Sequence, residues 1–411
     1  MNPPPSSSSV ALIPNIGAEE GPDWPRLLDK PAVAATLSLW RHLFPARHHL
    51  VGTETAPESW PESMGARPEG AAFSWLDDLP LAHWLGDAAA MKLAQEKGLE
   101  VVGPPSETIL HVHDKAFACR ASDSLGLTPS SLKGLSHIIE PEELRSSTQW
   151  IDRVEQVIQT WPAFTQGQFC LKPRLGSSGR GRVSGQAEAF DRVSLAGAAR
   201  GLARRGGAVL EPWLSRSSDF SVQLHIGETE PAITILGSLQ LWVTHTGLYR
   251  GHLGEVDSRG RVFSGSPEEE EARMAAAALA SEARDLGFRG PCGVDGLSFE
   301  IPAPESEAPQ PILRPIVEFN ARFTLGTVVI GLIRRNLSRL HDELALSPGE
   351  RRAFFFALDT PRSDSSWEDI ARNLPSRSLC LPLAPSTAAA RPGLIFADSL
   401  EVLRSLLPET A

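Results

Sequence analysis

The sequence predicts a chain of mixed α/β and α+β class, in which a small parallel α/β unit is followed by two β-rich units. Three observations predict this class. Short apolar runs alternate with helical stretches at the start of the chain, and glycine then punctuates short β-rich pieces between residues 167 and 207. Beyond residue 208, long alternating strands surround one alanine-rich helix, which is typical of a layered β-rich domain.

The size and composition of the chain limit what it can be. Its 411 residues, 41% of them hydrophobic, predict a large core and two or three structural units. With 39 lysines and arginines against 50 aspartates and glutamates, the net charge is −11, which argues against broad binding to nucleic acid. The four cysteines lack C-x-x-C spacing, so neither a disulfide framework nor a zinc ribbon is indicated. Without a signal peptide or a spanning run, we expect a cytoplasmic protein that does not bind membranes.

The first predicted domain covers residues 10–105. Residues 1–9 are mostly prolines and serines and are expected to be disordered. The apolar run Val10–Ile13 predicts the first strand, which ends at Pro14–Gly17. Apolar pieces then alternate with helical ones up to Glu100–Pro104, as in a small parallel α/β unit.

A linker helix and a lid-like unit are predicted over residues 106–207. Helical spacing extends from Asp114 to Leu125 and stops at Gly126. Two short β-rich pieces, residues 168–172 and 208–211, flank the glycine-dense segment.

Residues 208–340 are predicted to form the larger β-rich unit. A helix from Pro267 to about Leu286 opens with glutamates that suit its N-terminal dipole. Residues 301–310, rich in proline and glutamate, are predicted to be an insertion in a hairpin. The predicted strands are 220–226, 233–243, 293–299 and 312–319.

Residues 341–411 are predicted to be a C-terminal extension. A closing strand at residues 393–397 and a helix at 399–407 follow a proline-rich stretch. This segment has no readable motif, so its role stays open.

The first chemical candidate is an apolar strand that ends in a lysine and continues into a glycine-serine loop. Such a loop can offer backbone N–H groups to phosphate oxygens without obstruction by a Cβ atom, while the lysine supplies a charge. It is not a P-loop, because the lysine precedes the glycines. For this segment alone, a glycine-rich hairpin turn is the alternative. The candidate residues are Lys172, Gly176, Ser177, Ser178, Gly179 and Gly181.

The second candidate lies on two predicted neighbouring strands. Alternation puts Glu318, Asn320 and Arg322 on one face of a strand. Carboxylate and amide oxygens suit Mg²⁺, and Arg322 adds a charge for a transferring phosphoryl group. Asp295, in the preceding apolar strand, needs a metal or a basic partner if it is buried. Taken singly, a solvated edge strand and a turn aspartate remain the alternatives.

In combination, these segments resemble the ATP-grasp superfamily over roughly residues 100–335. The chain is similar to biotin carboxylases at Asp114–Lys115, at Lys172 with its loop and at Glu318-x-Asn320-x-Arg322. It is similar to D-alanine–D-alanine ligases at Glu211–Leu214 and at Asp219–Val222. The resemblance implies an ATP-grasp fold, in which a mobile lid subdomain and a larger β-rich core subdomain hold ATP.

The resemblance also implies roles for individual residues. Lys115 and Lys172 would contact the phosphates and the adenine side, and Asp219 would hold the ribose hydroxyls. The backbone from Glu211 through Trp213 to Leu214 would recognise adenine. Two Mg²⁺ ions, for which Mn²⁺ can substitute, would be bound by Asp295, Glu318 and Asn320, with Arg322 and Lys172 as catalytic residues.

The implied activity is that of a ligase, which would activate a carboxylate as an acyl phosphate for attack by an amine or thiol and release ADP and phosphate. The partners would be a small-molecule carboxylate and an amine or peptide, and an oligomer is possible. Arg250 and His252 follow a strand and a turn expected to face the cleft, so they are possible substrate contacts. Gly293 stands where D-alanine–D-alanine ligases carry an arginine, so their amino acid substrate is not implied.

Two alternatives to a ligase stay open. A carboxylase that activates bicarbonate is disfavoured, because the tetrapeptide Ala90–Leu93, which resembles a biotin attachment site, lies in a helical stretch. A nucleotide-binding regulatory protein without turnover would not need the full set of metal-binding residues.

Overall fold

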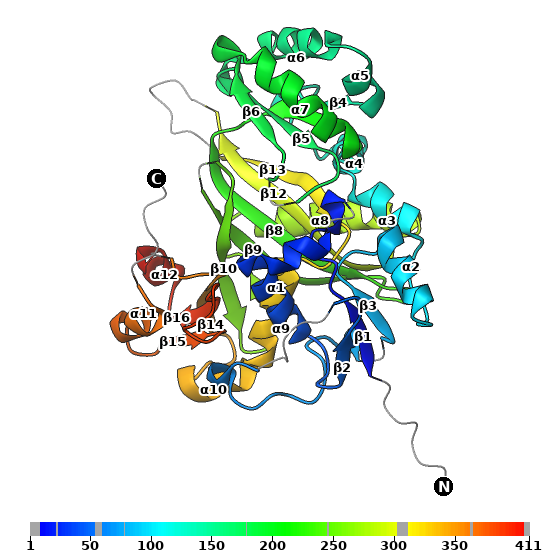
Figure 1. Cartoon of the computed structure of the whole chain (residues 1–411). Coiled ribbons are helices and arrows are strands. Elements are labelled where there is room, and N and C mark those ends of the chain that lie inside the picture. Colours follow the sequence, from blue (N-terminus) through cyan, green and yellow to red (C-terminus); the bar gives the residue numbers. More distant parts are fainter. Residues whose placement is uncertain are drawn as a thin grey trace, which may run out of the picture.

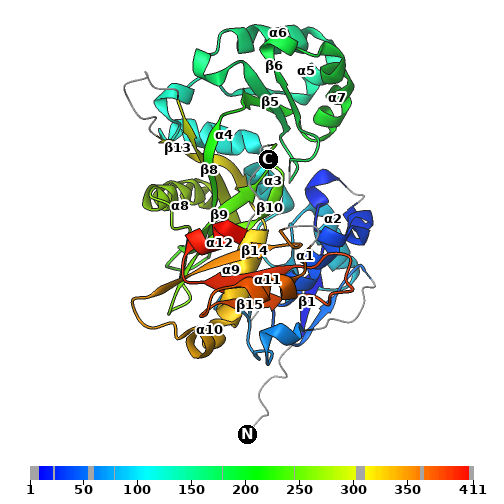
Figure 2. The same ribbon diagram turned by 90° about the vertical axis from the view of Figure 1, so that its left-hand side faces the viewer.

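The computed structural model shows three sheets and their covering helices (Figures 1 and 2). The predicted disorder of residues 1–9 and the predicted insertion 301–310 fall, except for Ser9 and Ile301, outside the described residues. No helix in the described part of the chain is long and apolar enough to cross a membrane. The structure describes residues 9–21, 24–53, 60–77, 79–177, 179–244, 246–301, 311–361 and 365–406.

The N-terminal sheet is parallel, as predicted. β1 (Val10–Ile13) lies between β2 (His48–Leu50) and β3 (Leu81–His83). All four residues of β1 are buried, because helices cover both faces of the sheet. The even-numbered residues of β1 belong to the main core with α1 (Pro31–Arg41), whereas the odd-numbered ones pack with α2 (Ala88–Glu96).

Residues 100–104 add no strand to this sheet. The Ala90–Leu93 tetrapeptide lies within α2, where Lys92 is paired with Glu96 of the same helix at 3.7 Å. It therefore does not occupy a hairpin turn.

The antiparallel sheet at the top of Figure 1, with its helices, forms what we call the middle unit (His137–Pro212). Its strand order is β4 (His137–Ile139), β7 (Ala208–Pro212), β5 (Gln168–Pro173) and β6 (Val183–Gln186). The helices are α5 (Pro141–Ser146), α6 (Gln149–Gln159) and α7 (Arg192–Arg204). Trp150, Phe169 and Leu202 belong to a hydrophobic cluster separate from the main core. The middle unit therefore has its own core and can act as one body.

The helices α3 (Ser106–His113) and α4 (Lys115–Ser124) connect the N-terminal sheet to the middle unit. Asp114 caps α4 by accepting a hydrogen bond from the backbone N–H of Ala116 at 2.8 Å. The same carboxylate accepts hydrogen bonds from Arg174, which follows β5. The start of α4 is thus fixed against the middle unit.

The largest sheet has nine strands within the described residues and is mostly antiparallel. Its order is β13 (Pro311–Asn320), β12 (Gly290–Glu300), β8 (Arg216–Ile226), β9 (Ile233–Val243), β11 (Val262–Phe263), β10 (Tyr249–Asp257), β14 (Arg351–Ala357), β16 (Gly393–Ala397) and β15 (Leu379–Pro382). The last three strands come from the predicted C-terminal extension, so that segment continues the sheet.

Helices cover this sheet on both sides. α8 (Glu269–Asp285) packs a stripe of buried alanines against β8, β9 and β13, because small side chains allow the helix to approach closely. α9 (Leu325–Arg335) packs on β8, β9 and β10 and is capped by Thr324. The remaining helices are α10 (Leu337–Leu344), α11 (Trp367–Asn373) and α12 (Leu400–Leu406).

The register of the large sheet brings distant residues onto one face. Glu318 lies opposite Asp295, which lies opposite Ser221. One row further along, Asp219 lies opposite Leu241, which lies opposite His252. Residues directly opposite each other share a face, so all these side chains point the same way. The sheets together confirm the predicted fold class, with parallel, antiparallel and large mixed sheets in chain order.

Candidate active site

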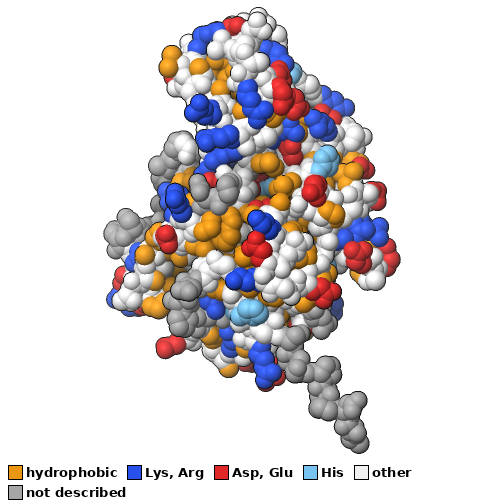
Figure 3. Space-filling view, turned by 45° about the vertical axis from the view of Figure 1, so that its right-hand side comes forward, with side chains coloured by type: hydrophobic (Ala, Val, Ile, Leu, Met, Phe, Trp, Pro, Cys, Tyr) orange, Lys and Arg blue, Asp and Glu red, His pale blue; other side chains and the backbone are white. Residues whose placement is uncertain are grey.

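A cavity of about 460 Å³ lies where the three sheets meet. The N-terminal unit contributes residues around Ile16–Glu19, the middle unit contributes the glycine loop, and the large sheet contributes the row described above. Lysine and arginine side chains gather where the middle unit faces the body of the molecule (Figure 3). The residues that line the cavity are therefore mostly far apart in the sequence.

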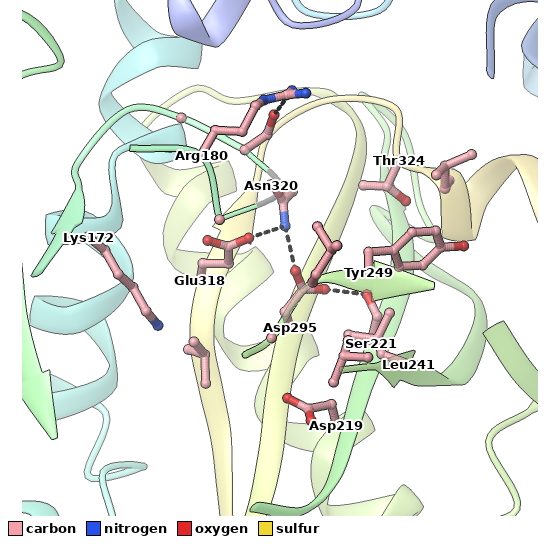
Figure 4. A pocket seen from close by; sticks show the side chains of 18 of the residues that line it. Lys172, Arg180, Asp219, Ser221, Leu241, Tyr249, Asp295, Glu318, Asn320 and Thr324 are labelled. Atoms are coloured by element: carbon pink, nitrogen blue, oxygen red, sulfur yellow. Dashed lines mark hydrogen bonds between the residues drawn. The ribbon is translucent and has the colours of Figure 1, made fainter. Parts of the chain in front are cut away.

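Two carboxylates face each other in this cavity. Ser221 donates a hydrogen bond to Asp295 Oδ1 at 2.5 Å, and Asn320 Nδ2 donates to Asp295 Oδ2 at 3.0 Å (Figure 4). Burial and the facing charge of Glu318 raise the pKa of Asp295 to about 7. Burial alone would also raise the pKa of Glu318, but Lys115 and Lys172 outweigh it and lower that pKa to about 2. Of the two carboxyl groups, Glu318 is therefore the more readily ionised.

Asn320 and Arg322 complete this cluster. Asn320 ends β13, and Arg322 lies just beyond the strand, where its guanidinium donates to Asn320 Oδ1 at 3.1 Å. The nitrogen of Asn320, and not its oxygen, faces the two carboxylates (Figure 4). The predicted grouping of Glu318, Asn320 and Arg322 around one cavity is observed.

Lys115, the first residue of α4, connects the carboxylate pair to the glycine loop. Its ammonium lies 3.1 Å from Glu318 Oε2 and donates a hydrogen bond to the carbonyl oxygen of Gly176 at 2.8 Å. The Lys115 side chain is only 12% exposed, so its charge acts in a partly desolvated setting.

Lys172, a predicted contact of the ATP phosphates, is paired with a carboxylate of the protein. Its ammonium is paired with Glu211, whose other oxygen accepts a hydrogen bond from Arg314 at 2.7 Å. Burial opposes the ionisation of Glu211, yet Arg314 and Lys172 lower its pKa to about 2. Lys172 is therefore held at the cavity wall by a charged network.

The glycine loop follows β5 and lines the cavity. Gly176, Gly179 and Gly181 have φ values of 151°, 69° and 74°, which favour glycine, and a Cβ atom on Gly181 would lie 2.7 Å from Arg205. Ser177 is buried, and Ser178 lies outside the described residues. The loop thus has the glycine-dependent geometry that the sequence predicts.

The predicted adenine and ribose residues line the same cavity. The guanidinium groups of Arg182 and Arg216 lie over the ring of Trp213, with their central carbons 4.4 and 4.6 Å from its centroid. Asp219 accepts a hydrogen bond from Arg216 at 3.0 Å, and Leu214 is buried beside them. Trp213 borders the cavity and is stacked by cations.

The two possible substrate residues behave differently. His252 is buried and lines the cavity, and among the described residues neither of its ring nitrogens is in hydrogen-bond geometry with a partner. Burial lowers the pKa of His252 to about 3, although the Gln240 main chain opposes the shift. Arg250 is exposed and does not line this cavity, so the expectation that it faces the cleft is wrong. A bulge between Tyr249 and Gly251 breaks the alternation and turns Arg250 outward.

Sequence reasoning missed several residues of this site. Glu19 and Trp84 come from the N-terminal unit, and Arg314 and Gln223 come from the large sheet. For Glu19 a signal was present, because it follows β1 at the carboxyl edge of a parallel sheet, where ligands commonly bind. The others carry no local signal, since strand register alone brings them into the cavity.

The donor set of the cluster fits Mg²⁺. Two half-buried carboxylates and an amide are hard ligands, and burial together with the facing charge of Glu318 raises the pKa of Asp295, an effect that a bound divalent ion would oppose. Asn320 would bind through oxygen only after its amide group rotates. Within the described residues, no group of three or more His, Cys, Asp or Glu side chains is placed to hold a metal.

No family model matches the chain, and neither does any curated protein. Solved structures do. Carboxyaminoimidazole ribonucleotide synthase from Aspergillus clavatus, in complex with ATP, is 12% identical, with 97% of this chain and 99% of that chain covered and a TM-score of 0.52. N5-carboxyaminoimidazole synthetase from Staphylococcus aureus, in complex with ADP, is 10% identical, with coverages of 97% and 95% and a TM-score of 0.50.

Pyruvate carboxylase from Rhizobium etli is 14% identical and has a TM-score of 0.51, with 97% of this chain but only 37% of that chain covered. At such low identity the likeness establishes the fold alone. The chain has the ATP-grasp fold, as its motifs suggested.

Proposed function

We propose that this protein is an ATP- and Mg²⁺-dependent ligase, which activates a carboxylate as an acyl phosphate for attack by an amine or thiol. The observation that carries the proposal is the facing pair Asp295 and Glu318, half-buried in the cavity of an ATP-grasp fold with Lys115 and Arg322 beside it. Two carboxylates that face each other in a partly desolvated site repel each other, and a bound divalent cation would offset that repulsion.

The nucleotide would occupy the part of the cavity between the middle unit and the large sheet. Lys115, Lys172 and the glycine loop would contact the phosphates, and the backbone from Glu211 to Leu214 would recognise adenine. Asp219 would accept hydrogen bonds from the ribose hydroxyls. The pairing of Lys172 with Glu211 supports a fixed lysine, which costs little further entropy when a phosphate binds.

Asp295, Glu318 and Asn320 would hold Mg²⁺, two ions in our proposal. Such ions, when bound, neutralise phosphate charge and stabilise the transferring phosphoryl group. Arg322 would stabilise negative charge on the same group. Its side chain is only 11% exposed, so its charge is weakly screened.

The reaction would proceed in two displacements. An oxygen of the substrate carboxylate attacks the γ-phosphorus, the bond to the β,γ-bridging oxygen breaks, and ADP leaves with that electron pair. The nucleophile then attacks the acyl carbon, the carbon–oxygen bond to phosphate breaks, and the nucleophile loses a proton. Inorganic phosphate and the ligated product result.

The remaining walls of the cavity suggest a substrate with an uncharged body. Ile16, Val33, Leu325 and Leu358 are apolar. Tyr249 adds a buried hydroxyl, and burial raises its pKa well above the ordinary value, so it stays neutral. A small ion such as bicarbonate would leave these walls unfilled, which disfavours the carboxylase alternative.

An ADP-release screen tests the proposal. Purified protein is given MgATP with pooled carboxylic acids, pooled amines or thiols, both pools, or bicarbonate, and Glu318→Gln is the inactive control. We expect ADP release only when a carboxylate and a nucleophile are present together. Release that requires bicarbonate would favour a carboxylase, and nucleotide binding without release under any condition would favour a regulatory protein.

A further inference from the structure

Two adjacent glutamates in the N-terminal unit contact different parts of the candidate active site. Glu19 and Glu20 end the short 3₁₀ turn Ala18–Glu20, which follows β1. Gly17, with φ of 91°, allows the chain to reverse there. Asn15 anchors the turn, because its side chain bonds both the N–H and the carbonyl oxygen of Leu85. The position of both carboxylates is thus set by the N-terminal sheet.

Glu19 points to the large sheet. Its Oε1 atom lies 3.4 Å from Nε of Arg322, and its side chain is 1% exposed. Burial alone would raise the pKa of Glu19, but the charge of Arg322 outweighs it and lowers that pKa, so the carboxylate is ionised. On its other side, the guanidinium of Arg322 donates to Asn320 Oδ1 and to the carbonyl oxygen of Phe323.

Glu20 points to the middle unit. Its carboxylate accepts a hydrogen bond from Arg180 of the glycine loop and lies 3.8 Å from Arg205. Arg205 in turn donates to the carbonyl oxygen of Arg180 at 2.8 Å. A single turn of the N-terminal unit therefore contacts Arg322 through Glu19, which also interacts with Ser177, and binds Arg180 of the loop through Glu20.

We propose that Glu19 is a positioning residue that orients Arg322 toward the transferring phosphoryl group, and that Glu20 docks the glycine loop over the nucleotide. The proposal rests on the proposed function, because it assigns both glutamates to the same site. The N-terminal unit would thereby set the geometry of the phosphoryl-transfer site as well as bind substrate.

The two contacts should have different kinetic consequences. Arg322 has a largely covered side chain that is otherwise bonded to neutral oxygens, so without the Glu19 charge its guanidinium would lose one of the groups that fix its direction. That loss should reduce kcat more than ATP affinity, since misplacement of a group acting in the transition state lowers the rate. Loss of Glu20 should instead free the loop, which weakens ATP binding.

The test compares Glu19→Gln and Glu20→Gln with Glu62→Gln, which removes the same charge from an exposed position of the same unit. For Glu19→Gln we expect at least a tenfold lower kcat with ATP affinity within about twofold. For Glu20→Gln we expect weaker ATP binding and faster amide hydrogen exchange of residues 176–181 in the presence of an ATP analogue. Glu62→Gln should match the wild type in both measurements.

A double-mutant cycle tests whether Glu19 acts through Arg322. In the Arg322→Ala background, Glu19→Gln should lower kcat little further, whereas additive losses of kcat would overturn the positioning role. Urea unfolding of the wild type, Glu19→Gln, Arg322→Ala and the double variant measures the interaction of the two side chains without turnover. Additive losses in the free energy of unfolding would also reject the positioning role. If the wild type cleaves no ATP, the proposed function fails, while the unfolding cycle and the exchange of the loop still decide this inference.

Discussion

Glu211 and Asp295 are carboxylates that line one cavity, but Glu211 is buried whereas Asp295 is half-buried, and their surroundings differ. Glu211 lies between Lys172 and Arg314, and these cations lower its pKa to about 2. Asp295 faces another carboxylate, and burial together with Glu318 raises its pKa to about 7. A buried acid that the chain itself neutralises is part of the wall, whereas one that the chain leaves short of positive charge indicates a ligand.

Removing the carboxylate of Glu318 should have the largest effect. Glu318→Gln keeps the shape of the side chain but removes a proposed metal-binding charge, so ADP release should fall below detection while the fold persists. The measurement is ADP release with the active substrate pair, with thermal unfolding as the control for folding. Unchanged release would place the chemistry outside this cluster.

The cluster of Glu211, Lys172 and Arg314 should instead matter for the stability of the fold. Glu211→Gln leaves Lys172 and Arg314 facing each other without their shared carboxylate, and breaking a buried pair typically costs about 3–5 kcal/mol. Urea unfolding measures the loss. A variant as stable as the wild type would show that Glu211 does not contribute to stability, and that Glu211 and Asp295 do not differ in this way.

Arg322→Ala should separate rate from binding. Removal of one well-placed charge lowers turnover on the order of 10²-fold, about 2.7 kcal/mol, with little change in ATP affinity. Steady-state kinetics and a nucleotide-binding titration give the two quantities. Normal turnover with greatly weakened binding would make Arg322 a ground-state ligand of the nucleotide.

The raised pKa of Asp295 predicts how stability depends on pH. The folded state binds this proton more tightly than the unfolded state, so the carboxyl contributes stability at low pH that is lost as pH rises from about 4 to about 7. In metal-free buffer, the free energy of unfolding of Asp295→Asn should therefore rise relative to that of the wild type over this range, by on the order of 2 kcal/mol. Thermal unfolding at several pH values measures the difference, and added Mg²⁺ should stabilise only the wild type. A difference that is independent of pH would contradict the charge deficit.

The smallest effects are expected for His252 and Arg250, the two possible substrate residues on β10. His252→Leu removes the polar ring from the cavity wall and should weaken use of the carboxylate about tenfold, or about 1.4 kcal/mol. Arg250→Ala should stay within about twofold of the wild type, because Arg250 is exposed outside the cavity. Both are compared by kcat/KM for the carboxylate, and a larger loss for Arg250→Ala would reverse the assignment of the two residues.

Much of this architecture was predictable because it depends on local periodicity. The first strand of the parallel sheet, α8 and the hairpin with Asp295 and Glu318 follow from apolar alternation and helix-start signals. The outward turn of Arg250 depends on a bulge that shifts the alternation by one residue, and the neighbouring Gly251 does not by itself fix the place of a bulge, because glycines also occur where a strand is regular.

The sequence alone determined the order of the candidate residues, the glycine-dependent loop and the likeness to ATP-grasp enzymes, because these reside in short segments. Only the tertiary structure decided which charges meet: Lys172 with Glu211 and Arg314, Lys115 with Glu318, and Glu19 with Arg322. The partners of each pair come from different elements, and no local pattern encodes a contact between elements. Whether a buried carboxylate is neutralised depends on those contacts and on burial, so the distinction between Glu211 and Asp295 exists only in the folded chain.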